Sequence, residues 1–174
     1  APDFDLFETM ISYLRDFPDR YHHPKEDDHF FPLVESRAPQ VRGDLAELKK
    51  QHHDGLRLTL ELRWKLDAWR KGEFGAFLAF DDAASQYIEF QRRHIGVEER
   101  SIIPAASANF TAADWEKVNA AFANNEDPMF GRQPKAEYDQ LFSKIAHMAP
   151  APHGLGERVE PKNPAPAYPS HSGS

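Results

Sequence analysis

Apolar residues recur every three or four positions along three long segments of the chain, and this helical spacing limits the fold more than any other feature of the sequence. The segments cover residues 3–35, 39–71 and 74–106, with prolines or glycines at their junctions. In none of them do apolar and polar residues alternate as they do in a β-strand. Three helices of these proportions are typical of an up-and-down bundle, so the predicted fold class is all-α.

Each predicted helix carries an apolar stripe. The stripes comprise Phe4, Phe7, Ile11, Leu14 and Leu33 in the first helix, Leu45, Leu48, Leu56 and Thr59 in the second, and Phe80, Ala84, Tyr87, Ile95 and Ile102 in the third. The first helix is expected to bend at Pro18 or Pro24. Two shorter helices are expected over 111–123 and 135–148. The Pro-rich residues 149–174 contain too few apolar side chains to pack, which predicts a disordered tail.

The composition excludes several kinds of protein. Hydrophobic residues make up 40% of the 174 residues and charged residues 28%, as in ordinary soluble domains. The net charge is −7 without a long basic run, so neither nucleic acid nor a membrane is an expected partner. No apolar stretch approaches the roughly 18 residues of a membrane helix, and the expected location is cytoplasmic. Because there is no cysteine, any metal must be bound by nitrogen and oxygen.

Two His-x-x-x-Glu pairs lie on the predicted inward faces. His22 and Glu26 align with the apolar stripe of the first helix, and His94 and Glu98 align with that of the third, because residues four apart share a helix face. His52 lies on the stripe of the second helix. Burying a carboxylate is costly unless its charge is paired or bound to a metal. Imidazole and carboxylate without thiolate suit iron, manganese or zinc, so the pattern predicts a two-metal carboxylate centre.

Other interpretations of these residues are open at this point. His52 taken alone is equally well explained as a hydrogen-bonded core residue. Each His-x-x-x-Glu pair also fits a helix-surface ion pair, which contributes roughly 0.2–0.5 kcal/mol. His23, Asp27 and Glu99 lie off the inferred stripes and are interpreted as solvated residues or as outer contacts of the ligands, although a kink at Pro24 could turn the first two inward.

Three segments carry a resemblance to a known family. They are Tyr-His-His-Pro-Lys-Glu at 21–26, Gln-His-His-Asp-Gly at 51–55, and His-Ile-Gly-Val-Glu-Glu with the following Ile-Pro at 94–104. In this order they resemble the hemerythrin-like, or HHE cation-binding, domain over about residues 3–108. The resemblance implies a four-helix bundle around a non-haem di-iron site, with metal bound by His22, His52 and His94 and bridged by Glu26 and Glu98.

The family's first helix, which contributes a further histidine ligand, has no counterpart before Ala1. The chain therefore resembles helices two to four of the family. We expect bundle helices at 1–108, a short helical extension at 109–148 and the tail at 149–174. A second copy could supply the absent helix, so a homodimer through the exposed apolar groove is among the expected interactions.

The resemblance implies binding of iron, or of another divalent metal, together with O2 or a related small ligand for sensing, storage or carriage. An alternative with the same five residues is a di-iron redox enzyme that acts on peroxide or nitric oxide or donates iron for cluster repair. A metal-free helical interaction module is a third interpretation. No residue is assigned a catalytic role, and a binding protein is favoured over an enzyme.

Overall fold

The computed structural model describes residues 2–16, 18–123, 140, 143 and 145–147. Within these residues the chain is helical and contains no strand, so the all-α prediction is confirmed. The helix expected over residues 135–148 lies mostly outside the described residues, and the expected tail lies entirely outside them. No helix of the described part is long and apolar enough to cross a membrane.

The three long predicted helices are present, and two of them are interrupted by short segments of π-helix. The first comprises α1 (Phe4–Asp16), η1 (Pro18–His22), α2 (His23–Lys25), η2 (Glu26–Phe30) and α3 (Phe31–Arg37). The second comprises a 3-10 turn, η3 (Pro39–Val41), and α4 (Arg42–Arg70). The third comprises α5 (Ala76–Val97), η4 (Glu98–Ile102) and α6 (Ile103–Asn109), and the shorter α7 (Ala112–Ala123) follows.

The π-helical segments η1, η2 and η4 share a sequence cause. Each of them ends two residues before a proline, namely Pro24, Pro32 and Pro104. Proline cannot donate a backbone hydrogen bond, and its ring clashes with the carbonyl group four residues back. The helix widens instead, and the amide of Phe31 donates to the Glu26 carbonyl oxygen, five residues back. Because each such turn contains an extra residue, the residues that follow it lie on a different face of the helix than even spacing predicts.

The turn between α4 and α5 depends on two glycines. Gly72 and Gly75 have φ angles of 75° and 74°, in the left-handed region that other residues rarely adopt. Gly72 directly follows Lys71, the C-cap residue of α4, at a position where such a glycine commonly ends a helix. The tight turn brings α5 back alongside α4, and these two helices form the most extensive helix pair.

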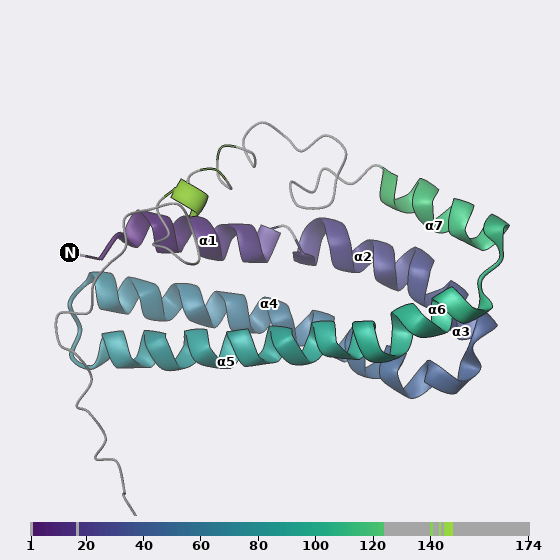
Figure 1. The fold of residues 1–174 in the computed structure, drawn as a ribbon. Coiled ribbons are helices and arrows are strands. Elements are labelled where there is room, and N and C mark those ends of the chain that lie inside the picture. The colour runs from purple at the N-terminus through teal and green to yellow at the C-terminus, as the bar shows by residue number, and fades with distance from the viewer. Residues whose placement is uncertain (1, 17, 124–139, 141–142, 144, 148–174) are drawn as a thin grey trace, which may run out of the picture.

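The long helices run side by side, and α7 lies over the second half of the first one, where it packs against η2 (Figure 1). Two separate apolar cores hold them together. One core contains Phe31, Val34, Ala38, Leu45, Leu48, Ile102, Ala105 and Ala106. The other contains Ile11, Leu62, Leu66, Phe80, Ala83 and Tyr87. In each helix, the residues between the two cores include the predicted ligands, so the polar site lies between two dry layers.

Two residues of the predicted stripes are exposed. Leu56 is 42% exposed and Ile95 is 48% exposed. Each directly follows a buried residue, Gly55 and His94 respectively, and successive residues of a helix point about 100° apart. Helical spacing alone therefore assigns more residues to the apolar stripe than the bundle buries.

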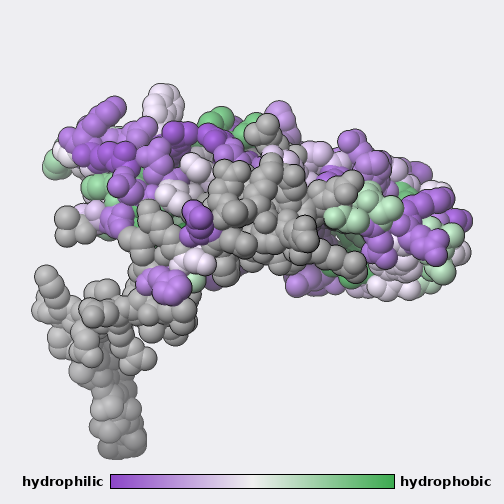
Figure 2. Space-filling view, turned by 90° about the horizontal axis from the view of Figure 1, so that it is seen from above, coloured by the Kyte–Doolittle hydropathy of each residue, from purple (hydrophilic) through white to green (hydrophobic). Residues whose placement is uncertain are grey.

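On the face that Figure 2 shows, most of the described residues at the surface are hydrophilic, with small apolar areas between them. On α4, Leu56, Leu60 and Trp64 are exposed and lie four residues apart along one face. The exposed fraction of Trp64 is 79%. The three side chains form an apolar row along the exposed side of α4.

Candidate metal centre

The predicted ligands lie in a buried polar layer between the two apolar cores. In α4, His52 lies between Leu48 of one core and Leu62 of the other. In the third helix, His94 lies between Tyr87 and Ile102 in the same way. Buried apolar side chains pack on both sides of this layer, and a low-dielectric surrounding strengthens electrostatic interactions.

Glu26 connects the first and second helices. Its Oε1 atom lies 3.2 Å from His22 Nε2, and its Oε2 atom lies 3.4 Å from His52 Nε2. The Glu26 residue is only 6% exposed. Glu26 and His52 belong to different helices. Their contact is therefore not explained by an ion pair on the surface of a single helix. For Glu26, the structure therefore places the carboxylate inside the bundle, as the sequence predicted.

His94 and Glu98 form the corresponding pair of the third helix. His94 Nε2 lies 3.3 Å from Glu98 Oε1, and the ring of His94 lies 5.1 Å from that of His52. His94 is buried, whereas the Glu98 side chain is 16% exposed. The five predicted residues thus form a group of three, His22, Glu26 and His52, and the pair His94 and Glu98, and the two groups meet at the rings of His52 and His94.

His23 is the site residue that the even helical spacing missed. Its ring stacks on that of His52 at 4.0 Å between centroids and lies 5.5 Å from that of His94. It is 8% exposed, so it is not a solvated residue. The π-helical segment η1 ends just before it, and the shift in helical face brings His23 inward. Pro24 is the sequence signal that could have identified it.

Asp27 and Gln51 contact the histidine rings from outside the group. Asp27 Oδ2 lies 3.1 Å from His52 Nδ1, and Gln51 Oε1 lies 3.1 Å from His94 Nδ1. Each ring therefore meets a fixed oxygen at Nδ1 and a glutamate oxygen at Nε2. The sequence had left Asp27 open as an outer contact and had not singled out Gln51.

The charges of the layer are mutually stabilising. Burial raises the pKa of Glu26, but the close approach of the His22 and His52 imidazoles lowers that pKa by more, so it lies well below the ordinary range. Burial likewise lowers the pKa of His52, whereas contacts with Glu26 and Asp27 raise it and prevail. Without metal, the pair favours a carboxylate at Glu26 and an imidazolium at His52.

The donor set fits a metal ion. His23, Glu26, His52 and His94 each offer a ligand atom, and these four atoms lie within 4.8 Å of one another. All four residues are buried. Within the layer, several buried atoms have no hydrogen-bond partner, among them Glu26 Oε2, Asp27 Oδ1, His52 Nε2 and Glu98 Oε1. Buried polar atoms are normally satisfied, and nitrogen and oxygen donors facing one another without a hydrogen bond are what a cation would satisfy.

Helix α7 covers the first-helix side of this layer. The ring of Phe122 lies 6.0 Å from that of His22 in an edge-to-face arrangement, and α7 packs against η2. The start of α7 is fixed by Asp114, which accepts hydrogen bonds from Arg37 Nε and Nη2, each at 3.0 Å. Asp114 also accepts from the backbone amide and hydroxyl of Thr111, as in a capping box.

Among the described residues, the other histidines stay outside the layer. His29, His53 and His147 are exposed. His147 makes a hydrogen-bond contact with the Ser143 carbonyl oxygen. His153 and His171 lie outside the described residues.

Comparison with known families gives a match over most of the bundle. The model of the hemerythrin HHE cation binding domain matches residues 2–106, which is more than half of the chain. Comparison with curated proteins and with solved structures finds no match. The matched range ends before α7, the helix that covers the site. The family match and the buried histidine and glutamate group fit a metal-binding protein. The chain belongs to the hemerythrin HHE cation-binding domain family.

Proposed function

We propose that the protein is a non-haem di-iron binding protein of hemerythrin type that also binds O2 or a related small ligand, for sensing, storage or carriage. The observation that carries this proposal is the buried layer in which Glu26 Oε2 and His52 Nε2 face each other at 3.4 Å without a hydrogen bond. A buried carboxylate so placed is stable when a cation completes its surroundings.

The proposed ligands are His22, Glu26, His52, His94 and Glu98, and the position of His23 supports adding it to this set. Six nitrogen and oxygen donors without a thiolate are compatible with two ions, as in carboxylate centres of other helix bundles. A bound iron pair would supply an open coordination position and the electrons that O2 chemistry requires. The chain's own residues would hold the ions, exclude water from the layer and keep the imidazoles oriented.

The first experiment is metal analysis of the purified chain after anaerobic loading with Fe²⁺. We expect about two iron ions per chain. A protein that takes up no Fe²⁺, Mn²⁺ or Zn²⁺ above a heat-denatured control would contradict the proposal. Stoichiometric O2 binding, seen optically, supports a binding protein. Catalytic consumption of peroxide or nitric oxide by the same preparation would instead favour the redox enzyme.

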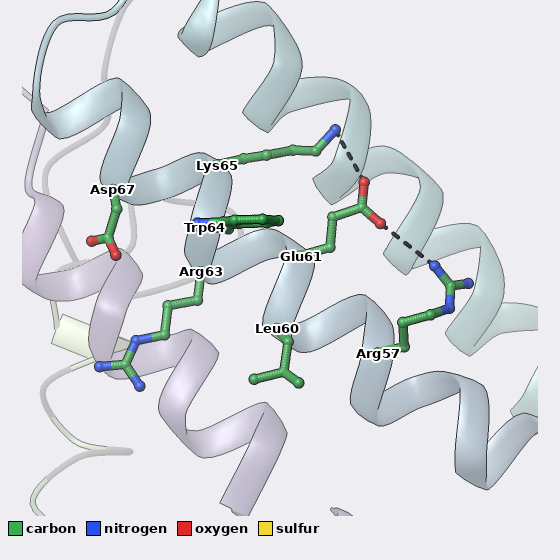
Figure 3. Close-up of a pocket in the computed structure, with 7 residues that line it drawn as sticks. All are labelled: Arg57, Leu60, Glu61, Arg63, Trp64, Lys65 and Asp67. Carbon is green, nitrogen blue, oxygen red and sulfur yellow. Dashed lines mark ion pairs between the residues drawn. The ribbon is translucent and has the colours of Figure 1, made fainter.

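The exposed face of α4 favours a second function, association of two copies of the chain. Leu60 and Trp64 border a shallow depression on this helix, with charged side chains around them (Figure 3). If a second α4 packs antiparallel, centred on residue 62, Arg57 lies opposite Asp67 and Leu60 lies opposite Trp64. Both pairs are complementary, one in charge and one in apolar character.

This dimer is testable by sedimentation velocity as a function of protein concentration. We expect weak, concentration-dependent dimers, because one helix face is smaller than the roughly 800 Å² per partner of a stable interface. Trp64→Glu should give monomers at all concentrations. Arg57→Asp should weaken the dimer, and combining it with Asp67→Arg should restore it. A wild-type chain that stays monomeric at every concentration, or a dimer that Trp64→Glu leaves intact, would exclude this interface.

A further inference from the structure

The imidazole rings of His52 and His94 are held by side chains behind them, and these contacts decide which ring nitrogen faces the site. At His52 the outer oxygen is a carboxylate oxygen, Asp27 Oδ2, and at His94 it is an amide oxygen, Gln51 Oε1. Each contact joins two different helices, and the paired residues are 25 and 43 positions apart in the sequence. The two rings are thus fixed by tertiary structure.

The orientation of Gln51 is itself determined. Its Nε2 group donates to Glu47 Oε1 at 3.0 Å. A carboxylate only accepts hydrogen bonds, so the amide nitrogen of Gln51 must face Glu47 and its oxygen must face His94. An amide oxygen also only accepts, and the donor must therefore be His94 Nδ1–H. In the neutral ring, the lone pair is then on Nε2, the atom that faces Glu98.

The same reasoning applies to His52. Asp27 Oδ2 accepts a hydrogen bond, so Nδ1 of His52 carries a proton and Nε2 is the nitrogen available to a cation. The Nε2 atom faces Glu26 Oε2 and has no hydrogen-bond partner. The two rings differ in one respect: the acceptor behind His52 carries a full negative charge, whereas the acceptor behind His94 is neutral. Hydrogen bonds to an ionised acceptor are about twice as strong as those between neutral groups.

We propose that Asp27 and Gln51 are positioning residues of the metal centre. They hold the rings of His52 and His94 with Nδ1 protonated and Nε2 directed into the site, and Asp27 makes His52 the stronger of the two metal ligands. The inference rests on the proposed metal-binding function. Glu47 extends the set by fixing the amide of Gln51. Such outer contacts typically change metal affinity 10–100-fold.

The first test is independent of metal. In the metal-free protein, ¹⁵N chemical shifts of the histidine rings above their titration range report which nitrogen is protonated. We expect Nδ1–H for both His52 and His94, opposite to the preference of free histidine. In Asp27→Leu only His52 should lose this preference, and in Gln51→Leu only His94 should lose it. Nε2–H rings in the wild-type protein would overturn the proposal even if metal binds tightly.

The second test is Co²⁺ affinity, measured by optical titration against a competing chelator. Asp27→Leu should weaken binding 10–100-fold, and Gln51→Leu should weaken it by less, because the lost acceptor is neutral. Gln51→Glu keeps an acceptor and should retain affinity. Asp28→Leu is the matched control, since Asp28 is the exposed next residue. Equal affinities for Asp27→Leu and Asp28→Leu would overturn the proposal. A wild-type chain that binds no metal would overturn the proposed function and leave the ring assignment to the NMR experiment.

Discussion

At the scale of single residues, Glu26 is the centre of the polar layer. Its two oxygens face imidazoles from different helices, so its charge is compensated on both sides. Removing a charged member of a buried group leaves the other members uncompensated, and this is more damaging than loss of one surface contact. Glu98 is less enclosed and contacts the layer through His94 alone among the described ion pairs.

We predict that Glu26→Ala and Glu98→Ala each abolish most metal uptake, because each removes an oxygen that the remaining histidines cannot replace. The matched controls are Asp28→Ala and Glu99→Ala, which remove exposed carboxylates of the same segments and should bind metal like the wild type. Elemental analysis of the four variants, with circular dichroism as the check on folding, measures the effect. Unchanged metal content in both glutamate variants would remove these residues from the site.

At the scale of helical elements, the site is shaped by the short π-helical segments and by helix α7. The π-helical segments η2 and η4 begin at Glu26 and Glu98, so the same local irregularity occurs at both predicted bridging residues. π-bulges are often found at functional sites, since they turn side chains away from the even helical register. Helix α7 then covers the histidine of the first pair with Phe122.

We predict that Asp114→Asn releases the start of α7 without unfolding the bundle, because it removes the charge that binds Arg37. Hydrogen exchange should accelerate over residues 112–123 and stay unchanged over residues 42–70. Glu116→Gln, an exposed change in the same helix, is the control. Equal exchange in the two variants would mean that the ion pair does not hold α7.

The same ion pair predicts a pH dependence. Hydrogen bonds from Arg37 and Thr111 lower the pKa of Asp114 below its ordinary value of 3.8. A group with a lowered folded-state pKa contributes stability above its unfolded pKa and loses it as the pH falls towards the folded one. The attachment of α7 should therefore be constant above about pH 5 and weaken only below about pH 4. Hydrogen exchange of α7 across pH 3–7 tests this, and release between pH 5 and 7 would contradict it.

At the scale of the whole molecule, the polar layer divides the hydrophobic core into two parts. Each apolar core joins the three long helices at one end of the bundle, and the layer between them contains compensated charges in place of packed side chains. Metal bound there would connect all three helices at the middle. Binding to the folded state alone stabilises a protein in proportion to the logarithm of ligand concentration over Kd.

We predict that metal raises the melting temperature. At a free metal concentration of 100 times Kd the stabilisation is about 2.7 kcal/mol, which corresponds to roughly 5–10 °C for a protein of this size. Differential scanning calorimetry with and without Fe²⁺ or Co²⁺ measures the shift. Glu26→Ala should not show it, and a wild-type melting temperature that is insensitive to metal would argue against binding at the layer.

The sequence alone determined the all-α class, the three long helices and their turns, because helical periodicity and glycine or proline signals act over a few residues. It also identified Glu26 and Glu98 beside histidines, since spacing by four is a local property. The inward position of His23 has a local cause, the widening of the helix before Pro24, but an evenly spaced helix pattern does not describe it. Tertiary structure alone decided that Gln51 holds His94 and that Arg37 fixes α7, because these contacts span 43 and 77 residues, which no local pattern encodes.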